Sequence, residues 1–202
     1  MDKESLYKNA IKAGRTLKNL ENLRIEMTNW WIKDVPKYDP SDGWENAEFL
    51  FLLEAPGRMS ANRNGSWFIS RDNNDPTAKN CSTFHQETWI PREKTLNWNI
   101  VPWYIGSIDQ KKIRHPAKID IEEGYWFLIR LIELLPKLKA IVLQWKSAQK
   151  IQKRLEDYFL TNKKNILILI CPHPSNQSIN RYPQNRKHIM RTFLDVKKLI
   201  EW

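Results

Sequence analysis

Residues 48–55 read Glu-Phe-Leu-Phe-Leu-Leu-Glu-Ala, and Pro56 and Gly57 follow directly. This apolar run shows no alternation of polar and apolar side chains, and the proline–glycine pair ends it. Such a run is typical of a strand that is buried on both faces, as in the centre of a parallel sheet. We therefore predict a central parallel strand at these residues.

Other segments on both sides of this run show strand or helix patterns. Three further apolar runs of strand length occupy residues 97–105 (NWNIVPWYI), 140–145 (AIVLQW) and 166–171 (ILILIC). Helical spacing of apolar residues covers residues 3–32, 121–135, 147–160 and the tail from 183. Strands that alternate with helices predict an α/β protein, a three-layer α/β/α sandwich around a central four-stranded, mainly parallel sheet.

The length and composition predict a single soluble domain. A chain of 202 residues suffices for one domain, with residues 1–32 as a lead-in helix and 48–188 as the core. No apolar run approaches the ~20 residues of a membrane span, and the charged N-terminus does not resemble a secretory signal. The two cysteines are too few for a disulfide framework, a four-thiolate zinc site or an iron–sulfur cluster. We expect a monomer in the cytoplasm or associated with the nucleoid.

The positive charge is concentrated at one end of the chain. Residues 1–136 hold 19 basic and 19 acidic side chains, whereas residues 137–202 hold 14 basic and 4 acidic ones. This imbalance is consistent with a polyanionic partner, since each neutralised phosphate releases counterions. A solvated lysine-rich surface is the alternative explanation.

Polar segments follow three of the predicted strands. Glu54 comes at the end of the first run, Asn99 lies in the second, and His173 follows the last. Because ligands bind beyond the carboxyl ends of parallel strands, these carboxylate, amide and imidazole groups are candidates for one site that binds a small planar ligand. Taken singly, each also has a structural explanation, as an ion-pair, turn or rim residue.

These segments resemble motifs of the uracil-DNA glycosylase superfamily. Residues 54–57 (Glu-Ala-Pro-Gly) resemble its strand-end motif, and residues 173–181 (HPSNQSINR) resemble its motif that begins His-Pro-Ser. Phe68 lies where the family places a phenylalanine that stacks on the extruded base, and Asn99 where it places its base-reading asparagine. The resemblance implies a monofunctional glycosylase that flips a base out of single- or double-stranded DNA without a metal or other cofactor.

The resemblance also implies roles for individual residues. Glu54 would position or activate the attacking water, and His173 would contact a carbonyl oxygen of the leaving base. Base binding would involve Ala55, Phe68 and Asn99. DNA contacts would come from Ser175, Asn176, Gln177, Ser178, Arg181 and Arg186. With no lysine inside the matched motifs to form a Schiff base, an abasic product without strand cleavage is expected.

The sequence departs from the family pattern at three points. Leu53 stands where the family usually has glycine, and the branch with Glu-Ala-Pro-Gly commonly carries a four-cysteine iron–sulfur cluster that two cysteines cannot build. Gln177 stands where many relatives insert a leucine into the base stack, which leaves Ile179 or Tyr182 as alternative wedges. The implied protein is a divergent member without the cluster.

Several interpretations remain open at this stage. Residues 58–83 are rich in polar side chains and predict a long loop, which either is plain surface or enlarges the pocket for a base bulkier than uracil. The substrate is then uracil, another deaminated base, or a hypermodified phage base in an antiviral role. A catalytically inactive DNA-binding module is a different class of function. A metal-dependent nuclease or phosphatase would use Glu54, Asp72, Asp75, His85 and His173.

Overall fold

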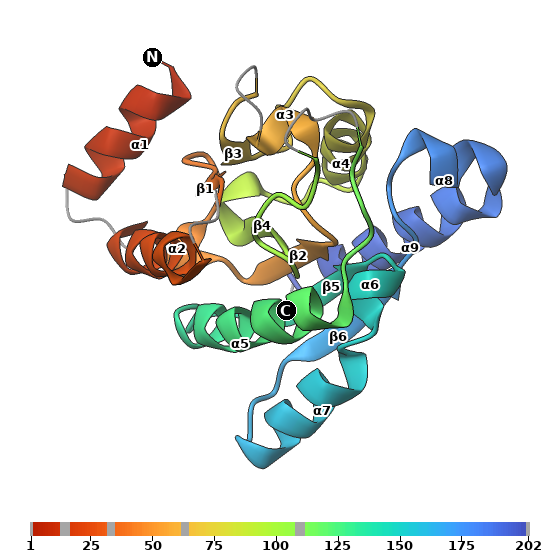
Figure 1. The fold of residues 1–202 in the computed structure, drawn as a ribbon. Helices are drawn as coiled ribbons and strands as arrows, with labels where there is room; N and C mark the ends of the chain where they lie inside the picture. Colours follow the sequence, from red (N-terminus) through yellow and green to blue (C-terminus); the bar gives the residue numbers. More distant parts are fainter. Residues whose placement is uncertain (1, 13–16, 32–34, 62–64, 108–111, 201–202) are drawn as a thin grey trace.

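A four-stranded parallel sheet lies at the centre of the molecule (Figure 1). The computed structural model describes residues 2–12, 17–31, 35–61, 65–107 and 112–200. The strands are β2 (Phe49–Leu53), β4 (Thr95–Asn99), β5 (Ala140–Gln144) and β6 (Leu167–Cys171), in the order β4-β2-β5-β6. All neighbouring pairs are parallel, which confirms the predicted α/β fold class.

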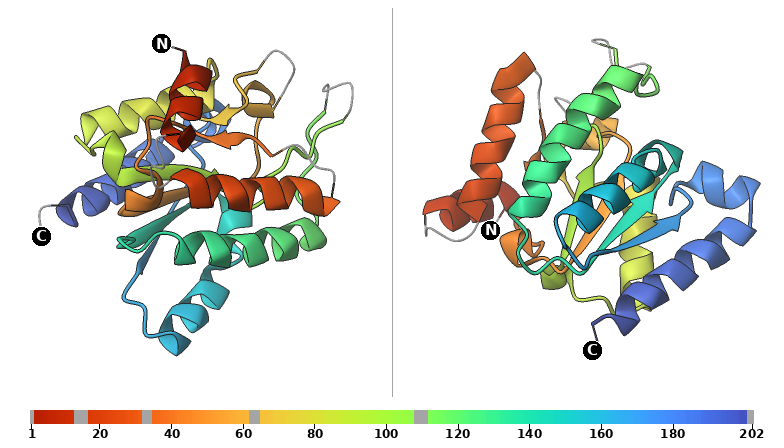
Figure 2. Two further views of the ribbon diagram at one scale, coloured as in Figure 1. Left: turned by 90° about the vertical axis from the view of Figure 1, so that its left-hand side faces the viewer. Right: turned by 90° about the horizontal axis from the view of Figure 1, so that it is seen from below.

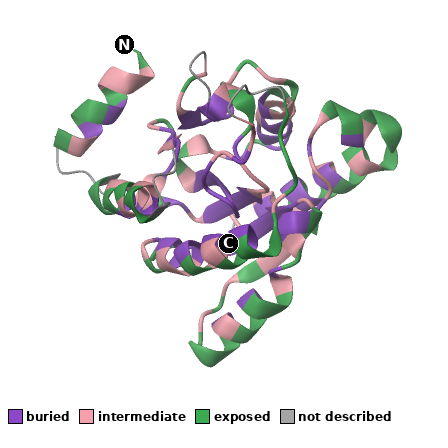
Figure 3. Ribbon diagram, in the orientation of Figure 1, coloured by how far each residue is buried: buried purple, intermediate pink, exposed green. Residues whose placement is uncertain are grey.

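Helices cover both faces of this sheet (Figure 2). Phe49 and Phe51 of β2 pack in one hydrophobic cluster, whereas Leu50 and Leu52 pack in the other, because successive side chains of a strand point to opposite faces. The first cluster is completed by α4 (Pro76–Glu87) and α9 (Gln184–Lys198), and the second by α2 (Leu17–Trp31), α5 (Lys118–Glu133) and α7 (Gln152–Thr161). Burial on both faces explains why the β2 sequence is apolar throughout, and Figure 3 shows the central strands as buried.

The N-terminal region differs from its prediction. Two helices, α1 (Lys3–Lys12) and α2, replace the single helix expected over residues 3–32, and residues 13–16 lie outside the described part. A small parallel pair that the sequence did not indicate joins β1 (Lys37–Tyr38) to β3 (Phe68–Ile69). Short 3₁₀ turns, η1 (Trp44–Asn46) and η2 (Arg92–Lys94), precede β2 and β4.

The prediction of a long loop over residues 58–83 is also wrong in part. A short helix, α3 (Arg58–Ala61), lies at its beginning, and α4 starts within it. The Asp75 carboxylate accepts a hydrogen bond from Ala78 N at 2.9 Å, and Pro76 occupies the first turn. An aspartate cap followed by proline is a helix-start signal, but the sparse apolar residues of α4 gave little periodicity to support it.

The remaining differences concern element boundaries. β4 ends at Asn99, and the apolar residues 100–105 are not part of the strand. The helix expected over residues 147–160 is divided into α6 (Lys146–Gln149) and α7, and a short helix, α8 (Asn176–Arg181), precedes α9. None of the helices in the described ranges is long and apolar enough to cross a bilayer.

Candidate active site

Glu54 and Asn99 lie at the same edge of the sheet because β2 and β4 are neighbouring parallel strands. Leu53 pairs with Asn99, and the ladder continues one step further through Ile100 N to Leu53 O at 2.9 Å and Val101 N to Glu54 O at 2.9 Å. His173 follows β6, whose carboxyl end lies at the same edge. The three strand-end groups therefore come to one side of the sheet, as the sequence predicted.

A cavity of about 380 Å³ opens at this edge. Its lining includes Ala55, Asn99 and His173, together with residues of α3 and the first turns of α4. This volume lies within the range of sites that enclose small molecules. In this cavity, the predicted base-binding side chains Ala55 and Asn99 meet the predicted catalytic imidazole.

Two residues that the sequence interpretation missed flank the Glu54 carboxylate. Ser147 Oγ, on α6, donates a hydrogen bond to Glu54 Oε2 at 2.6 Å. His115 Nδ1 lies 3.7 Å from Glu54 Oε1, and the His115 side chain is 92% exposed. Ser147 is the third residue after β5, which ends at Gln144, so its position behind a strand end was the signal that could have identified it. Ser147 fixes Oε2 of the carboxylate, and Oε1 faces the His115 side chain.

The surroundings of His173 keep its imidazole neutral. Burial lowers the pKa of His173 to about 4, although the Glu54 carboxylate partly offsets this effect. Ser175 N donates to His173 Nδ1 at 3.1 Å, and the Trp145 ring stands edge-on to the imidazole at 5.3 Å. Because Nδ1 accepts, the proton of the neutral ring is on Nε2, which is then a hydrogen-bond donor.

We expect NMR titration of His173 to show a neutral ring down to about pH 5 and protonation near pH 4. Its ordinary pKa is 6.5, so the unfolded chain takes up this proton first. His173 therefore contributes to a loss of folding stability as the pH falls from about 6.5 through 4. The same ring in the urea-unfolded protein, titrating near 6.5, is the control. A folded-state midpoint of 6 or above would contradict the assignment.

Asn99 is only 3% exposed, and its side chain lines the cavity. Within the described ranges, no partner of its amide group is found. Its neighbour on the same strand face, Asn97, is instead bonded through Nδ2 to Asp42 Oδ2 at 3.1 Å. The Asn99 amide therefore remains available as both donor and acceptor for a ligand in the cavity.

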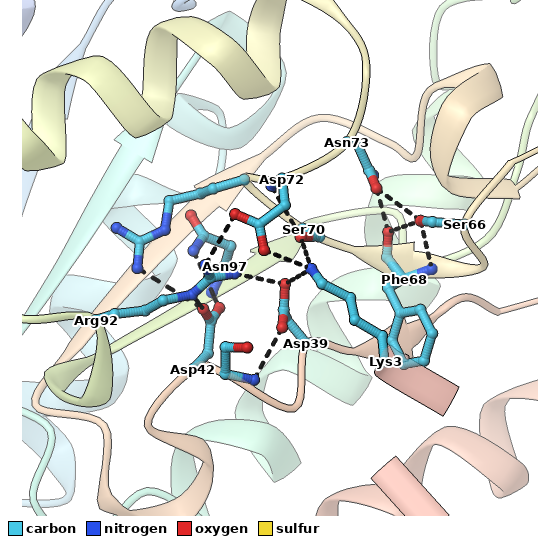
Figure 4. A network of polar contacts seen from close by, with 12 residues as sticks. Lys3, Asp39, Asp42, Ser66, Phe68, Ser70, Asp72, Asn73, Arg92 and Asn97 are labelled. Carbon is cyan, nitrogen blue, oxygen red and sulfur yellow. Dashed lines mark hydrogen bonds and ion pairs between the residues drawn. The ribbon is translucent and has the colours of Figure 1, made fainter. Parts of the chain in front are cut away.

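Phe68 does not line the cavity, contrary to the stacking role expected for it. Its ring is buried in the hydrophobic core, edge-on to Tyr7 with 5.6 Å between ring centroids, and Figure 4 shows its backbone N–H bonded to Ser66 Oγ. Because adjacent strand residues point in opposite directions, the following residue, Ile69, lines the cavity instead. The orientation of the Phe68 ring in this structure does not support the stacking role.

The residues predicted to contact DNA lie on and beside α8. Ser175 Oγ caps α8 by accepting from Ser178 N at 3.3 Å, and Asn176 Oδ1 accepts from Asn80 Nδ2 at 2.9 Å. A second hollow, of about 670 Å³, adjoins them and is lined by Trp145, Gln177, Ser178, Arg181, Tyr182 and His188, among others. Arg186 is separate from this hollow, because its guanidinium bonds to Glu87 Oε1 at 2.9 Å.

The five residues considered for a metal-dependent nuclease do not come together. His85 packs against Phe51 and Phe193 in the core, and the Asp72 carboxylate is bound by Lys3 and Arg92. Across the described ranges, no cluster of three or more histidine, cysteine or acidic side chains has the geometry of a metal site. That hypothesis therefore has no structural basis in these residues.

The fold and the site together define a class: an α/β/α protein with a cavity at the carboxyl edge of its parallel sheet. The Asn99 amide and the neutral His173 imidazole line this cavity, and the Glu54 carboxylate lies at the same edge, outside the lining. A family model described as the uracil DNA glycosylase superfamily matches residues 40–197. The chain belongs to this superfamily of DNA glycosylases, which act on DNA.

The comparison with solved structures agrees on the fold. The chain is similar to the crystal structure of wild-type SMUG2 of Pedobacter heparinus, with a TM-score of 0.52 and 14% sequence identity over 77% of this chain and 76% of that one. The comparison with curated protein sequences finds no match.

Proposed function

We propose that this protein is a monofunctional DNA glycosylase that flips uracil or a related deaminated or modified base into the cavity and hydrolyses its N-glycosidic bond. The observation that carries the proposal is the convergence of Glu54, Asn99 and His173 at one sheet edge, beside a cavity of about 380 Å³. Extrusion is required because the bond cannot be attacked while the base is stacked in the duplex.

In the proposed reaction, Glu54 orients the water that attacks C1′ of the sugar and accepts its proton. The bond between C1′ and the base nitrogen breaks, and the electron pair leaves with the base. Ser147 keeps one carboxylate oxygen fixed, and the other oxygen, which lies 3.7 Å from Nδ1 of the exposed His115 side chain, holds the water.

The departing base carries negative charge on its carbonyl oxygen. A neutral His173 with its proton on Nε2 is suited to donate to that oxygen, and a preorganised donor lowers the barrier where charge develops. A protonated imidazole would instead pair with the Glu54 carboxylate. The low pKa of His173 therefore supports its role as a hydrogen-bond donor.

The hollow beside α8 is the proposed path of the DNA strand. It continues from the catalytic side of the sheet through His115 and Trp145 to Arg181 and Tyr182. Ile179 is partly buried against the core, whereas Gln177 and Tyr182 are exposed. We infer that the residue that enters the emptied base stack is one of these two.

The test is to incubate the protein, in chelator, with labelled single-stranded and duplex oligonucleotides that each contain one uracil, hypoxanthine or modified cytosine. Alkali treatment and sizing then reveal abasic sites. We expect strand cleavage only after alkali and at one type of base. Strand breaks before alkali would contradict a monofunctional enzyme, and DNA binding without any excision would favour the inactive module.

We expect Asn99→Ala to lower the excision rate by roughly 10–10²-fold, because each lost edge hydrogen bond costs about 1–3 kcal/mol. The control is Asn162→Ala, which removes an exposed asparagine at the end of α7. An Asn99→Ala rate equal to that of the control would show that Asn99 does not read the base.

A further inference from the structure

The first helix of the chain, α1, contacts both strands of the small β1–β3 pair. Each of these strands has only two residues, with Lys37 paired to Phe68 and Tyr38 paired to Ile69. Strands of globular proteins usually have about five or six residues, so this pair needs support from outside the sheet. The family model begins at residue 40, and α1 therefore lies outside the part of the chain that it matches.

Side chains of α1 bind across the pair. Both carboxylate oxygens of Glu4 accept hydrogen bonds from Lys37 Nζ of β1 at 2.7 Å. The Tyr7 ring contacts the Phe68 ring of β3 edge-on. The third side chain, Lys3, extends to the segments in which the chain leaves the two strands.

The Lys3 ammonium group joins these two segments. Its Nζ donates to Asp39 Oδ2 at 2.6 Å, and Asp39 is the first residue after β1. It also donates to the hydroxyl group of Ser70, which is the first residue after β3. A third contact, with Asp72 Oδ2, measures 2.8 Å. One cation of α1 thus holds together two segments that are distant in the sequence, as Figure 4 shows.

The site that receives Lys3 contains buried negative charge. The Asp39 side chain is fully buried, and a second cation, Arg92, donates to Asp39 Oδ2 at 2.6 Å and to Asp72 Oδ1 at 2.9 Å. Burial raises the pKa of Asp72, but the hydrogen bonds from Arg92 and Lys3 lower it to about 2. Because a buried carboxylate that loses a counter-ion destabilises its surroundings, removal of Lys3 is expected to loosen this site.

The segment that Lys3 holds also forms part of the cavity wall. Ile69, Ser70 and Arg71 line the cavity. The hydroxyl oxygen of Ser70 accepts a hydrogen bond from Asp72 N at 3.0 Å, so the group that binds Lys3 also closes the turn after β3. A displacement of this turn therefore moves one wall of the cavity.

We propose that α1 is a clamp on the β1–β3 pair and that Lys3 is a positioning residue for base excision. Lys3 does not line the cavity. It acts through Ser70 and Asp72, which fix the wall formed by residues 69–71. The positioning role rests on the proposed glycosylase function, whereas the clamp can be measured without DNA.

Hydrogen exchange of the free protein tests the clamp. In Lys3→Gln, the amide of Asp72 is expected to exchange at least about tenfold faster than in the wild type, because its bond to Ser70 opens more often. The matched control is Lys12→Gln, which removes an exposed lysine at the end of α1 and is expected to exchange like the wild type. Equal exchange of Asp72 in Lys3→Gln and the wild type overturns the clamp.

Single-turnover excision tests the positioning role. Lys3→Gln is expected to raise the protein concentration that gives half of the maximal rate by roughly tenfold, because a small displacement of the wall weakens its contacts with the base. The maximal rate is expected to stay within about threefold, since Glu54 and His173 are held by other segments. Lys3→Arg, which keeps the charge, is expected to restore half-saturation. Unchanged half-saturation in Lys3→Gln overturns the positioning role.

Thermal unfolding separates these effects from a loss of folded protein. A variant that is destabilised but folded at the assay temperature, with its wall in place, keeps the half-saturation of the wild type. Should Lys3→Gln unfold below that temperature, Glu4→Gln takes its place, because it weakens the contact with Lys37 and leaves Lys3 intact. A smaller increase of Asp72 exchange in Glu4→Gln supports the clamp, and unchanged exchange contradicts it.

The two proposals fail in different ways. If the wild-type protein excises no base, the proposed function and the positioning role both fail, and hydrogen exchange still decides whether α1 is a clamp. If the wild type excises a base while Lys3→Gln changes neither exchange nor half-saturation, the clamp is refuted and the glycosylase function stands.

Discussion

Glu54→Gln is expected to lower the rate of base excision by roughly 10²–10⁴-fold, the range typical of a removed general base. Glutamine has nearly the same shape, and its oxygen still accepts the hydrogen bond from Ser147 Oγ, so the side chain stays in place. What the variant loses is the negative charge that receives the water proton. The measurement is single-turnover excision with the oligonucleotide that the wild-type protein prefers.

Two controls distinguish chemistry from binding in this experiment. DNA affinity, measured by fluorescence anisotropy, is expected to stay within a few fold, because the substitution lies beside the bond that breaks. Glu156→Gln on α7, an exposed glutamate, is expected to behave as wild type. Ser147→Ala is expected to cause a smaller loss than Glu54→Gln, since it frees the carboxylate without removing it. Full activity of Glu54→Gln would mean that another group activates the water.

Gly124→Ala is expected to lower the free energy of unfolding by about 2 kcal/mol. A Cβ at this position of α5 would lie 1.8 Å from the Ile100 carbonyl oxygen and 2.9 Å from its carbon. Such overpacking costs up to about 3 kcal/mol, and the better helix propensity of alanine offsets about 1 kcal/mol of it. The expected fall in Tm is about 4–8 °C for a chain of this size.

The same substitution links the packing of α5 to the active site. Ile100 directly follows Asn99, so a shift of the Ile100 backbone moves the base-reading amide. We expect Gly124→Ala to lower excision at temperatures where the protein is still folded. For the Tm, Gly57→Ala is the control, because a Cβ there meets no atom within 4 Å. It is not a control for excision, since Gly57 lines the cavity. An unchanged Tm in Gly124→Ala would show that α5 moves away from the Ile100 carbonyl oxygen without any loss of folding stability.

The strand residues of the central sheet were predictable because their signal is local. A strand covered on both faces must be apolar throughout, and residues 49–53 satisfy this without any knowledge of their neighbours. The same applies to β5, whose five residues are all buried. Parallel strands then place their carboxyl ends at one edge, so the meeting of Glu54 and Asn99 followed from topology alone.

Other parts of the site depend on contacts between distant segments. Ser147 reaches Glu54 across 93 positions of the chain, and no periodicity encodes that contact. Phe68 faces the core because β3 pairs with β1, a pairing of two-residue strands that is too short to leave a pattern. The wall formed by α4 was taken for a loop, because few of its side chains are apolar and buried.

The sequence by itself determined the four strands of the central sheet, their parallel direction and the positions of Glu54, Asn99 and His173 at strand ends, because these properties follow from hydrophobic patterning and chain connectivity. Only the tertiary structure decided which side chains face the cavity and which groups hold them there. The direction in which a side chain points, and the groups that it contacts, depend on packing between segments that are far apart in the chain. Arg71 shows the difference, since its burial beside Thr95 gives a polar loop residue a place in the cavity.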